Sequence, residues 1–383
     1  MKLSFPFNYC RMINREEGLM ENKLKLIVPE NFKDFGKSVN DKINDIQQTD
    51  HNYILDMELI RFANGEGKCV IGESVRDKNI FILTDLYNHS VCYNSINGIH
   101  HLGPDEHYQD IKRILSAMGG HSIKTSLVMP LLYQSRQDKR TMRESLDCAM
   151  ALQELQWYGI KELFTFDAHE PKVSNAIPYN MTFSNGYATG ELIVDILQNE
   201  NINMSKLFIV GPDEGARAKA KFVADILGGV RYGNFDKRRD YTKVIDGKNP
   251  IHYHEFVGPN DLSGYDIIVV DDMIDSGSSI IDTAKQLKEK GANQIFLMTT
   301  FALFSKGIDK FKDGVNRQYI DKVYTTNLTY VNSEYLKEDW LKVVDCSGKV
   351  ATIISNSYDG ISIRELLNGK EETAEKVKRL KKQ

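Results

Sequence analysis

Short apolar runs alternate with helix-period stretches along most of this chain, and that alternation restricts the fold more than any other feature. Between the runs, apolar residues recur at helical spacing, for example at Ile111, Ile114, Leu115 and Met118. Buried parallel strands joined by crossover helices produce this pattern, so we predict an α/β protein with mainly parallel sheets flanked by helices. The expected strands are residues 24–28, 80–83, 126–129, 163–166, 207–210, 267–270 and 294–300.

Two domains fit the chain length of 383 residues, since one domain takes roughly 150 residues. The alternation is interrupted at 178–190, a stretch that is rich in turn-forming residues. We therefore place the boundary near Phe183 and expect domains at 24–183 and 184–349. Residues 370–383 are highly charged and are expected to form a frayed helix or a tail.

Composition excludes several classes of protein. Lys plus Arg is 49 and Asp plus Glu is 53, a net charge of −4 that argues against a general nucleic-acid binder. No apolar run approaches the roughly 18 residues that a membrane span needs. The scattered cysteines form no C-x-x-C pair and the first residues do not resemble a secretory signal, so we expect free thiols and a cytoplasmic protein.

The strand expected at 267–270 is followed by the most informative polar segment of the chain. Small residues at 276–279 precede a helix that begins at Ile280, so backbone N–H groups there can cradle a phosphate. Asp271 and Asp272 can accept hydrogen bonds from hydroxyl groups or hold a metal ion beside that phosphate. A sugar phosphate satisfies both features. The alternative is that these residues only cap the helix.

Residues 269–280 resemble the phosphoribosyl pyrophosphate-binding loop of type I phosphoribosyltransferases and of ribose-phosphate pyrophosphokinases. Further segments resemble the pyrophosphokinases alone, in that family's order and at similar spacing. The resemblance extends over residues 24–369 and implies two type I phosphoribosyltransferase-like domains, with ATP on the first, ribose 5-phosphate on the second, and 350–369 completing the first. The further segments are 61–66, 135–140, 166–171, 211–215 and 236–239.

The resemblance implies a ribose-phosphate diphosphokinase, which transfers the β,γ-diphosphoryl group of MgATP to the C1 hydroxyl of ribose 5-phosphate and releases AMP. Phosphoryl transfer depends mainly on positioning and charge neutralisation. By the resemblance, Lys237 is the catalytic lysine and Arg239 is a catalytic residue that also contacts the ribose phosphate. Both lie in the polar stretch 234–243, which we expect to be a mobile loop; the alternative is a solvated basic turn.

The resemblance also implies a Mg²⁺ ion held by His169 and Asp213, although imidazole is an unusual ligand for this metal. In this family the nucleotide loop serves a neighbouring subunit, so a homo-oligomer, either a dimer or a hexamer, is implied. The implied contacts with ATP are Phe62, Asn64, Gly65, Glu66, Arg136 and Gln137, and those with ribose 5-phosphate are Arg239, Asp271, Asp272, Asp275, Ser276, Gly277, Ser278 and Ser279.

Several positions depart from the family pattern. Asn64 replaces the usual Asp, Tyr133 replaces a glycine, and Glu214 and Ala216 replace His and Gly. Two alternatives therefore stay open: a non-catalytic paralogue that regulates such a synthetase, and a phosphoribosyltransferase. A separate metal site is disfavoured, because the first of two histidine groups is expected in a polar loop with Gly and Pro, and the second alternates as a strand would, with no third ligand at diagnostic spacing. These groups are His100, His101 and His107, and His252 with His254.

Overall fold

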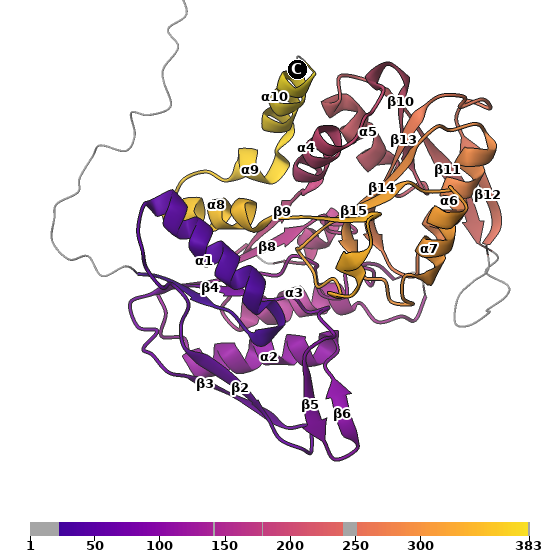
Figure 1. The fold of residues 1–383 in the computed structure, drawn as a ribbon. Helices are drawn as coiled ribbons and strands as arrows, with labels where there is room; N and C mark the ends of the chain where they lie inside the picture. The colour runs from indigo at the N-terminus through magenta and orange to yellow at the C-terminus, as the bar shows by residue number, and fades with distance from the viewer. Residues whose placement is uncertain (1–22, 141, 178, 240–250, 382–383) are drawn as a thin grey trace, which may run out of the picture.

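The computed structural model describes residues 23–140, 142–177, 179–239 and 251–381; of these, residues 237–239 and 251–254 are described by their backbone alone. Two sheets form the framework, one in each half of the chain (Figure 1). The first sheet is wholly parallel. Its strands, in spatial order, are β1 (Leu24–Ile27), β4 (Asn79–Leu83), β7 (Lys124–Val128), β8 (Glu162–Phe166) and β9 (Thr182–Gly186).

The second sheet is parallel except at one edge, where β11 and β12 pair antiparallel. Its spatial order is β12 (Ile251–Val257), β11 (Arg231–Arg239), β10 (Leu207–Gly211), β13 (Asp266–Ile274), β14 (Ile295–Ala302), β15 (Lys322–Thr326) and β16 (Leu341–Val344). The predicted fold class is confirmed, and each of the seven expected strands lies on a strand of one of these sheets.

Helices cover both sheets, as the alternation predicted. They are α1 (Lys33–Gln47), α2 (Pro104–Met118), α3 (Asp147–Trp157), α4 (Thr189–Asn199), α5 (Arg217–Ile226), α6 (Ser278–Glu289), α7 (Asp309–Asn316), α8 (Ser347–Tyr358), α9 (Arg364–Asn368) and α10 (Lys370–Leu380). Short 3₁₀ turns lie at Glu30–Phe32, Pro171–Ala176, Met204–Lys206 and Tyr335–Lys337. Within the described ranges, no helix combines the length and the apolar character that a membrane span needs.

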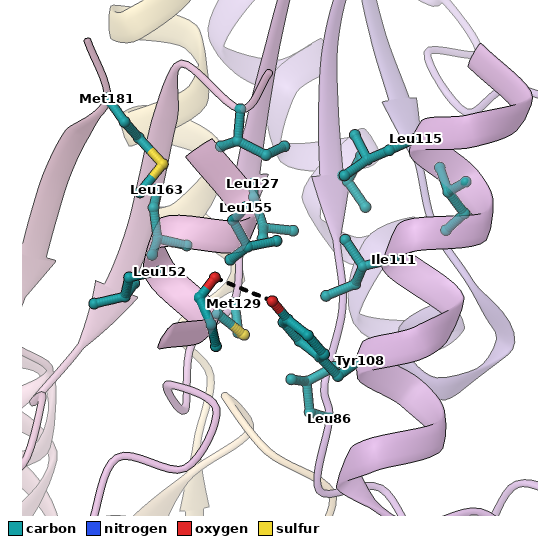
Figure 2. Close-up of a cluster of buried hydrophobic side chains, with 14 of the residues drawn as sticks. Leu86, Tyr108, Ile111, Leu115, Leu127, Met129, Leu152, Leu155, Leu163 and Met181 are labelled. Atoms are coloured by element: carbon teal, nitrogen blue, oxygen red, sulfur yellow. Dashed lines mark hydrogen bonds between the residues drawn. The ribbon is translucent and has the colours of Figure 1, made fainter. Parts of the chain in front are cut away.

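One core of the first half lies between its sheet and helices α2 and α3 (Figure 2). Ile111 and Leu115, one turn apart on α2, point toward Leu127 and Leu155. The Tyr108 hydroxyl donates to the carbonyl of Ala151 at 3.0 Å, which satisfies this buried polar group. Burial of this apolar face gives α2 and α3 fixed positions against the sheet.

The end of the chain returns to the first half. Helix α8 packs along α1, and Val350, Ala351 and Ile354 share one buried cluster with Leu26 and Val39. The charged end, expected to be frayed or a tail, is largely the helix α10, which packs on α4 and α5.

Two antiparallel hairpins, absent from the expected elements, extend from the first half. They are β2 (Met57–Arg61) with β3 (Gly67–Ile71), and β5 (Cys92–Ser95) with β6 (Gly98–His101). Phe183, where we placed the domain boundary, lies within β9, the edge strand of the first sheet.

Candidate active site

Polar side chains of both halves meet at the carboxyl-terminal ends of the two sheets. They line a pocket of about 630 Å³ to which each half contributes acidic residues. Ligands of open α/β sheets bind in this position, beyond the ends of the strands. Three other pockets are larger: two, of about 810 and 720 Å³, lie beside α1, and one of about 700 Å³ lies beside α9. The described residues that line them include none of the predicted contacts. The lining residues that matter below are Asp167, His169, Asp213, Lys219, Asp271 and Asp272.

Strand β13 extends further than expected. We predicted that it ends at Val270 and that the two acidic residues lie in the following turn. The strand instead runs through Asp271 and Asp272 to Ile274, because the pairing with β14 continues to that residue. Both carboxylates are therefore held by a rigid central strand rather than by a loop.

The turn after β13 and the start of α6 contain the predicted phosphate cradle. Gly277 has φ +76°, and a Cβ at this position would overlap the ring of Phe311, so only glycine fits this close approach. Helix α6 begins at Ser278, and the backbone N–H groups of a first helical turn have no partner inside the helix. Ser276 and Ser279 flank these positions, and the segment has the small, hydroxyl-bearing character that suits an anion.

An ion pair joins the two halves at this turn. The Arg136 guanidinium, a predicted ATP contact from the first half, lies 2.8 Å from the carboxylate of Asp275, a predicted ribose 5-phosphate contact. The other carboxylate oxygen of Asp275 accepts from the Ser305 hydroxyl. Gln137, exposed on the same turn as Arg136, donates its backbone N–H to the Gln134 carbonyl. The structure thus brings predicted contacts for both substrates together.

A second cross-contact joins His169 to Asp272. The imidazole Nδ1 lies 2.8 Å from the carboxylate Oδ2, although the two residues are 103 positions apart. The hydrogen bond to the Asp272 carboxylate raises the pKa of His169 above its ordinary value of 6.5, while burial acts against this shift. Burial also acts against ionisation of Asp272, but the hydrogen bond and the charge of His169 outweigh it and lower the pKa of this carboxyl.

The pKa of Asp271 is shifted in the opposite direction to that of Asp272. Burial, followed by the negative charges of Asp272 and Asp213, raises the pKa of Asp271 well above its ordinary value. The Asp271 carboxylate accepts the backbone N–H of Asp272 at 2.9 Å. Neighbouring carboxyl groups whose pKa values are shifted apart in one pocket are typical of a site that handles hydroxyl groups and cations.

Three further residues at this junction were not among the predicted contacts. Lys219 of α5 lies 2.9 Å from the carboxylate of Asp167, which follows β8. The hydroxyl of Thr300 on β14 donates to the other oxygen of the same carboxylate. Sequence spacing carries no signal for this pair, because Asp167 and Lys219 are 52 positions apart.

Comparisons with known proteins agree with this arrangement. Residues 24–159 match the family described as the N-terminal domain of ribose phosphate pyrophosphokinase, and residues 243–368 match the phosphoribosyl synthetase-associated domain. The chain is a distant member of the ribose-phosphate pyrophosphokinase family. Ribose-phosphate pyrophosphokinase from Mycoplasmopsis pulmonis is 28% identical over 310 residues, 80% of this chain and 86% of that protein. The protein of that name from Vibrio cholerae is 26% identical over 316 residues, 82% of this chain and 88% of its own.

A solved structure supports the same fold. Phosphoribosylpyrophosphate synthetase from Mycobacterium smegmatis superposes with a TM-score of 0.71, covering 88% of this chain and all of that one. The sequence identity is 20%, so this likeness describes the fold alone.

The nucleotide loop expected from the ribose-phosphate pyrophosphokinase pattern forms the turn of the β2–β3 hairpin. Phe62 is 46% exposed, and Asn64 donates from its side chain to the Glu66 carboxylate at 3.1 Å. Gly65 closes the turn with φ +93°. In Figure 1 this hairpin lies at the end of the molecule away from α6 and α7. Within one chain, the turn is therefore far from the 275–279 segment.

The stretch expected to be a mobile loop is a strand throughout its described part, residues 234–239. Strand β11 runs to Arg239 and pairs antiparallel with β12, so Lys237 lies opposite His254. The prediction of a loop from residue 234 was wrong, since pairing with β12 gives the polar residues 234–239 an extended backbone. The Lys237 and Arg239 side chains and residues 240–250 lie outside what the structure describes.

The residues at the junction fit a hard cation that arrives with a nucleotide. Within the described ranges, no three His, Cys, Asp or Glu side chains form a group that could hold a metal ion. Mg²⁺ usually takes only one or two carboxylates together with water and substrate phosphates. Asp213, which accepts the Ala216 N–H at 3.0 Å, and His169 line the same pocket. Such a small set of protein ligands suits a metal ion whose other ligands are water and the phosphates of ATP.

The described members of the two other histidine groups have partners away from the pocket. The expectation that His100 and His101 lie in a loop was wrong, since both lie on β6, where the chain forms a hairpin. His100 contacts the Glu106 carboxylate at 3.0 Å, and His101 contacts the His89 carbonyl at 2.8 Å. His107 is buried on α2 and contacts the Asn88 carbonyl at 2.9 Å. His252 and His254 lie on β12, and their side chains are outside the described part.

Proposed function

We propose that this protein is a ribose-phosphate diphosphokinase, which makes phosphoribosyl pyrophosphate and AMP from MgATP and ribose 5-phosphate. The contact of 2.8 Å between His169 and Asp272 carries the proposal. It places the turn after β8, expected to serve the nucleotide and its metal, against the strand expected to serve the sugar. A reaction that transfers a group from one substrate to the other requires this proximity.

In the proposed reaction, the C1 oxygen of the sugar forms a bond to the β-phosphorus of ATP. The bond from that phosphorus to the α,β-bridging oxygen breaks, AMP leaves, and the hydroxyl proton passes to solvent. The segment 275–279 would hold the 5-phosphate through backbone N–H groups at the start of α6. Asp271 and Asp272 would accept hydrogen bonds from the ribose hydroxyls, and Arg136 would exchange its partner Asp275 for ATP phosphate oxygens.

A Mg²⁺ ion is proposed to be held by His169, Asp213 and ATP, and it would neutralise charge on the transferring phosphates. Positively charged side chains would stabilise the charge that develops during transfer. We assign this task to Lys237 and Arg239, because the resemblance gives them this role; both lie on β11, which neighbours β10 in the second sheet.

The direct test is product formation. Purified protein incubated with MgATP and ribose 5-phosphate should give AMP and phosphoribosyl pyrophosphate in equal amounts. The measurement is ³¹P NMR of the reaction mixture. ADP as the product, or consumption of ATP without ribose 5-phosphate, would refute the proposal.

Lys237→Ala should reduce kcat by roughly 10²- to 10³-fold, the usual effect of losing one preorganised electrostatic donor. The control is Lys221→Ala, since Lys221 is an exposed lysine of α5. The measurement is steady-state kinetics at saturating substrates. Equal turnover of Lys237→Ala and the control would remove Lys237 from the mechanism.

We further propose a homo-oligomer, either a dimer or a hexamer. The turn at 62–66 lies away from the 275–279 segment of its own chain (Figure 1), so it would reach the nucleotide of a neighbouring subunit. The exposed Phe62 ring would provide a stacking surface for adenine there.

A second candidate is a regulatory paralogue that makes no product. Tyr133, which stands where the family usually has glycine, supports this candidate. Its ring stacks on Tyr108 with centroids 4.3 Å apart, and its hydroxyl donates to Asp105 at 2.7 Å. This packing fills space just before the Arg136 turn. No product alone, but altered turnover of an active synthetase on mixing, would favour this candidate over the enzyme. Base-dependent pyrophosphate release without ATP would instead indicate a phosphoribosyltransferase.

A further inference from the structure

The turn after β8 has an unfavourable backbone conformation that other parts of the molecule hold in place. Asp167 has φ +42°, which is uncommon for a residue other than glycine and is often found at functional sites. Its backbone N–H donates to the Gly186 carbonyl at 2.8 Å, and the next N–H, of Ala168, donates to the Asn185 side chain at 3.0 Å. Both of these contacts come from β9 of the same sheet.

The side chain of Asp167 is held from the other half of the chain. Its carboxylate is 3% exposed and accepts from Lys219, whose side chain is 14% exposed, at 2.9 Å. The Thr300 hydroxyl donates to the second oxygen. Removal of one partner would leave the other charge buried and uncompensated. The ion pair therefore holds the Asp167 side chain in one position.

The next contact between the halves comes from β13, the neighbour of β14 in the second sheet. Thr300 lies on β14, and Asp272 lies on the adjacent β13, where Asp271 is paired with Thr299. His169 follows Asp167 by two residues and meets Asp272 at 2.8 Å. The position of the imidazole therefore depends on how the Asp167 side chain is held.

We infer that Lys219 is a positioning residue, which fixes the 167–169 turn of the first half so that His169 faces Asp272 across the pocket between the halves. This inference rests on the proposed function for its kinetic consequence. Lys219 acts through Asp167 and has no catalytic step of its own. Its positive charge also favours the ionised forms of Asp271 and Asp272.

The test compares three substitutions on α5. Lys219→Met keeps the length of the side chain and removes its charge, Lys219→Arg keeps the charge, and Lys221→Met makes the same chemical change at an exposed position two residues away. Lys219→Met should lower kcat by roughly 10- to 100-fold, as is usual when a residue that orients a metal ligand is lost. The KM for ribose 5-phosphate should change by less than about threefold, since the 275–279 segment is not altered. Lys219→Arg should restore at least part of kcat, and Lys221→Met should match the wild type.

A second readout does not depend on turnover. In protein with ¹⁵N-labelled histidine, the His169 Nδ1 signal, assigned by its loss in His169→Gln, should report the hydrogen bond to Asp272. This signature should be lost in Lys219→Met and kept in Lys221→Met. If the wild type makes no phosphoribosyl pyrophosphate, the proposed function fails while this readout still decides the role of Lys219.

Thr300→Val serves if Lys219→Met does not fold, because it removes only the second donor to Asp167. It should shift the same His169 signal and lower kcat with little change in KM. A folded Lys219→Met or Thr300→Val protein with an unchanged His169 signal would overturn the inference. So would a Lys219→Met protein in which only the KM for ribose 5-phosphate rises.

Discussion

The glycine before α6 offers a sharp test of the proposed phosphate cradle. In Gly277→Ala the new methyl group would overlap the Phe311 ring, and the residue would keep φ +76°. The ring cannot move aside easily: Phe311 is fully buried, and its centroid lies 5.1 Å from that of Phe304 and 6.0 Å from that of Trp340. The chain around residue 277 must therefore shift.

The magnitude has two parts, which a matched control separates. An L-residue in the left-handed region costs roughly 1–2 kcal/mol, and overpacking a buried site adds about 1–3 kcal/mol. Gly307 has a similar φ of +73° with no atom within 4 Å of an added Cβ, so Gly307→Ala has only the first part. The free energy of unfolding should fall about 1–3 kcal/mol further in Gly277→Ala than in Gly307→Ala.

Two measurements check this prediction. Urea unfolding followed by circular dichroism gives the two free energies, and the KM for ribose 5-phosphate reports the cradle. The KM should rise in Gly277→Ala and stay near the wild-type value in Gly307→Ala. Equal loss of stability in both variants would refute the packing argument, and an unchanged KM in a folded Gly277→Ala protein would refute the assignment of the phosphate.

Two further predictions concern contacts between the halves: Asp85 of the first half, which accepts hydrogen bonds from Thr329 and Tyr330 of the second, and the Arg136 ion pair. Burial raises the pKa of Asp85 from 3.8 to about 6, so the folded state favours the neutral carboxyl, and about 3 kcal/mol of stability present below pH 3.8 is lost as the pH rises past 6. Urea unfolding across this range should show the loss in the wild type and not in Asp85→Asn; parallel profiles would contradict it. Arg136→Ala breaks an exposed ion pair and should change the free energy of unfolding by less than about 1 kcal/mol, while the KM for ATP rises in steady-state kinetics. An unchanged KM would separate Arg136 from the nucleotide.

The sequence predicted the buried framework well because central strands of a parallel sheet carry a strong local signal. Residues 267–270 are apolar on both faces, and such a run has few alternatives inside an α/β protein. The hairpin β2–β3 was missed because its residues are only partly buried, so its composition is mixed. The strand β11 was taken for a loop because residues 236–239 are all charged, and this part of the strand pairs with the edge strand β12 near the border of the sheet, where charge is common.

The site was predictable where its residues follow one another and not where they meet by folding. The segment 271–279 could be recognised because small and acidic residues are contiguous there. The partner of His169 could not be deduced, since Asp272 is 103 positions away and nothing in the spacing couples them. Lys219 was missed for the same reason: on the sequence it is one of two lysines in a charged helix, and only burial distinguishes it from Lys221.

Helix α8 lies late in the sequence but packs on the first half of the chain, and this affects folding during synthesis. Val350 and Ile354 complete the cluster that covers Leu26 and Phe35, so one face of the first sheet lacks part of its cover until helix α8 has left the ribosome. Until then the nascent chain would expose apolar surface of the first half. A premature stop before residue 347 would leave that surface permanently bare and open to chaperones or to aggregation.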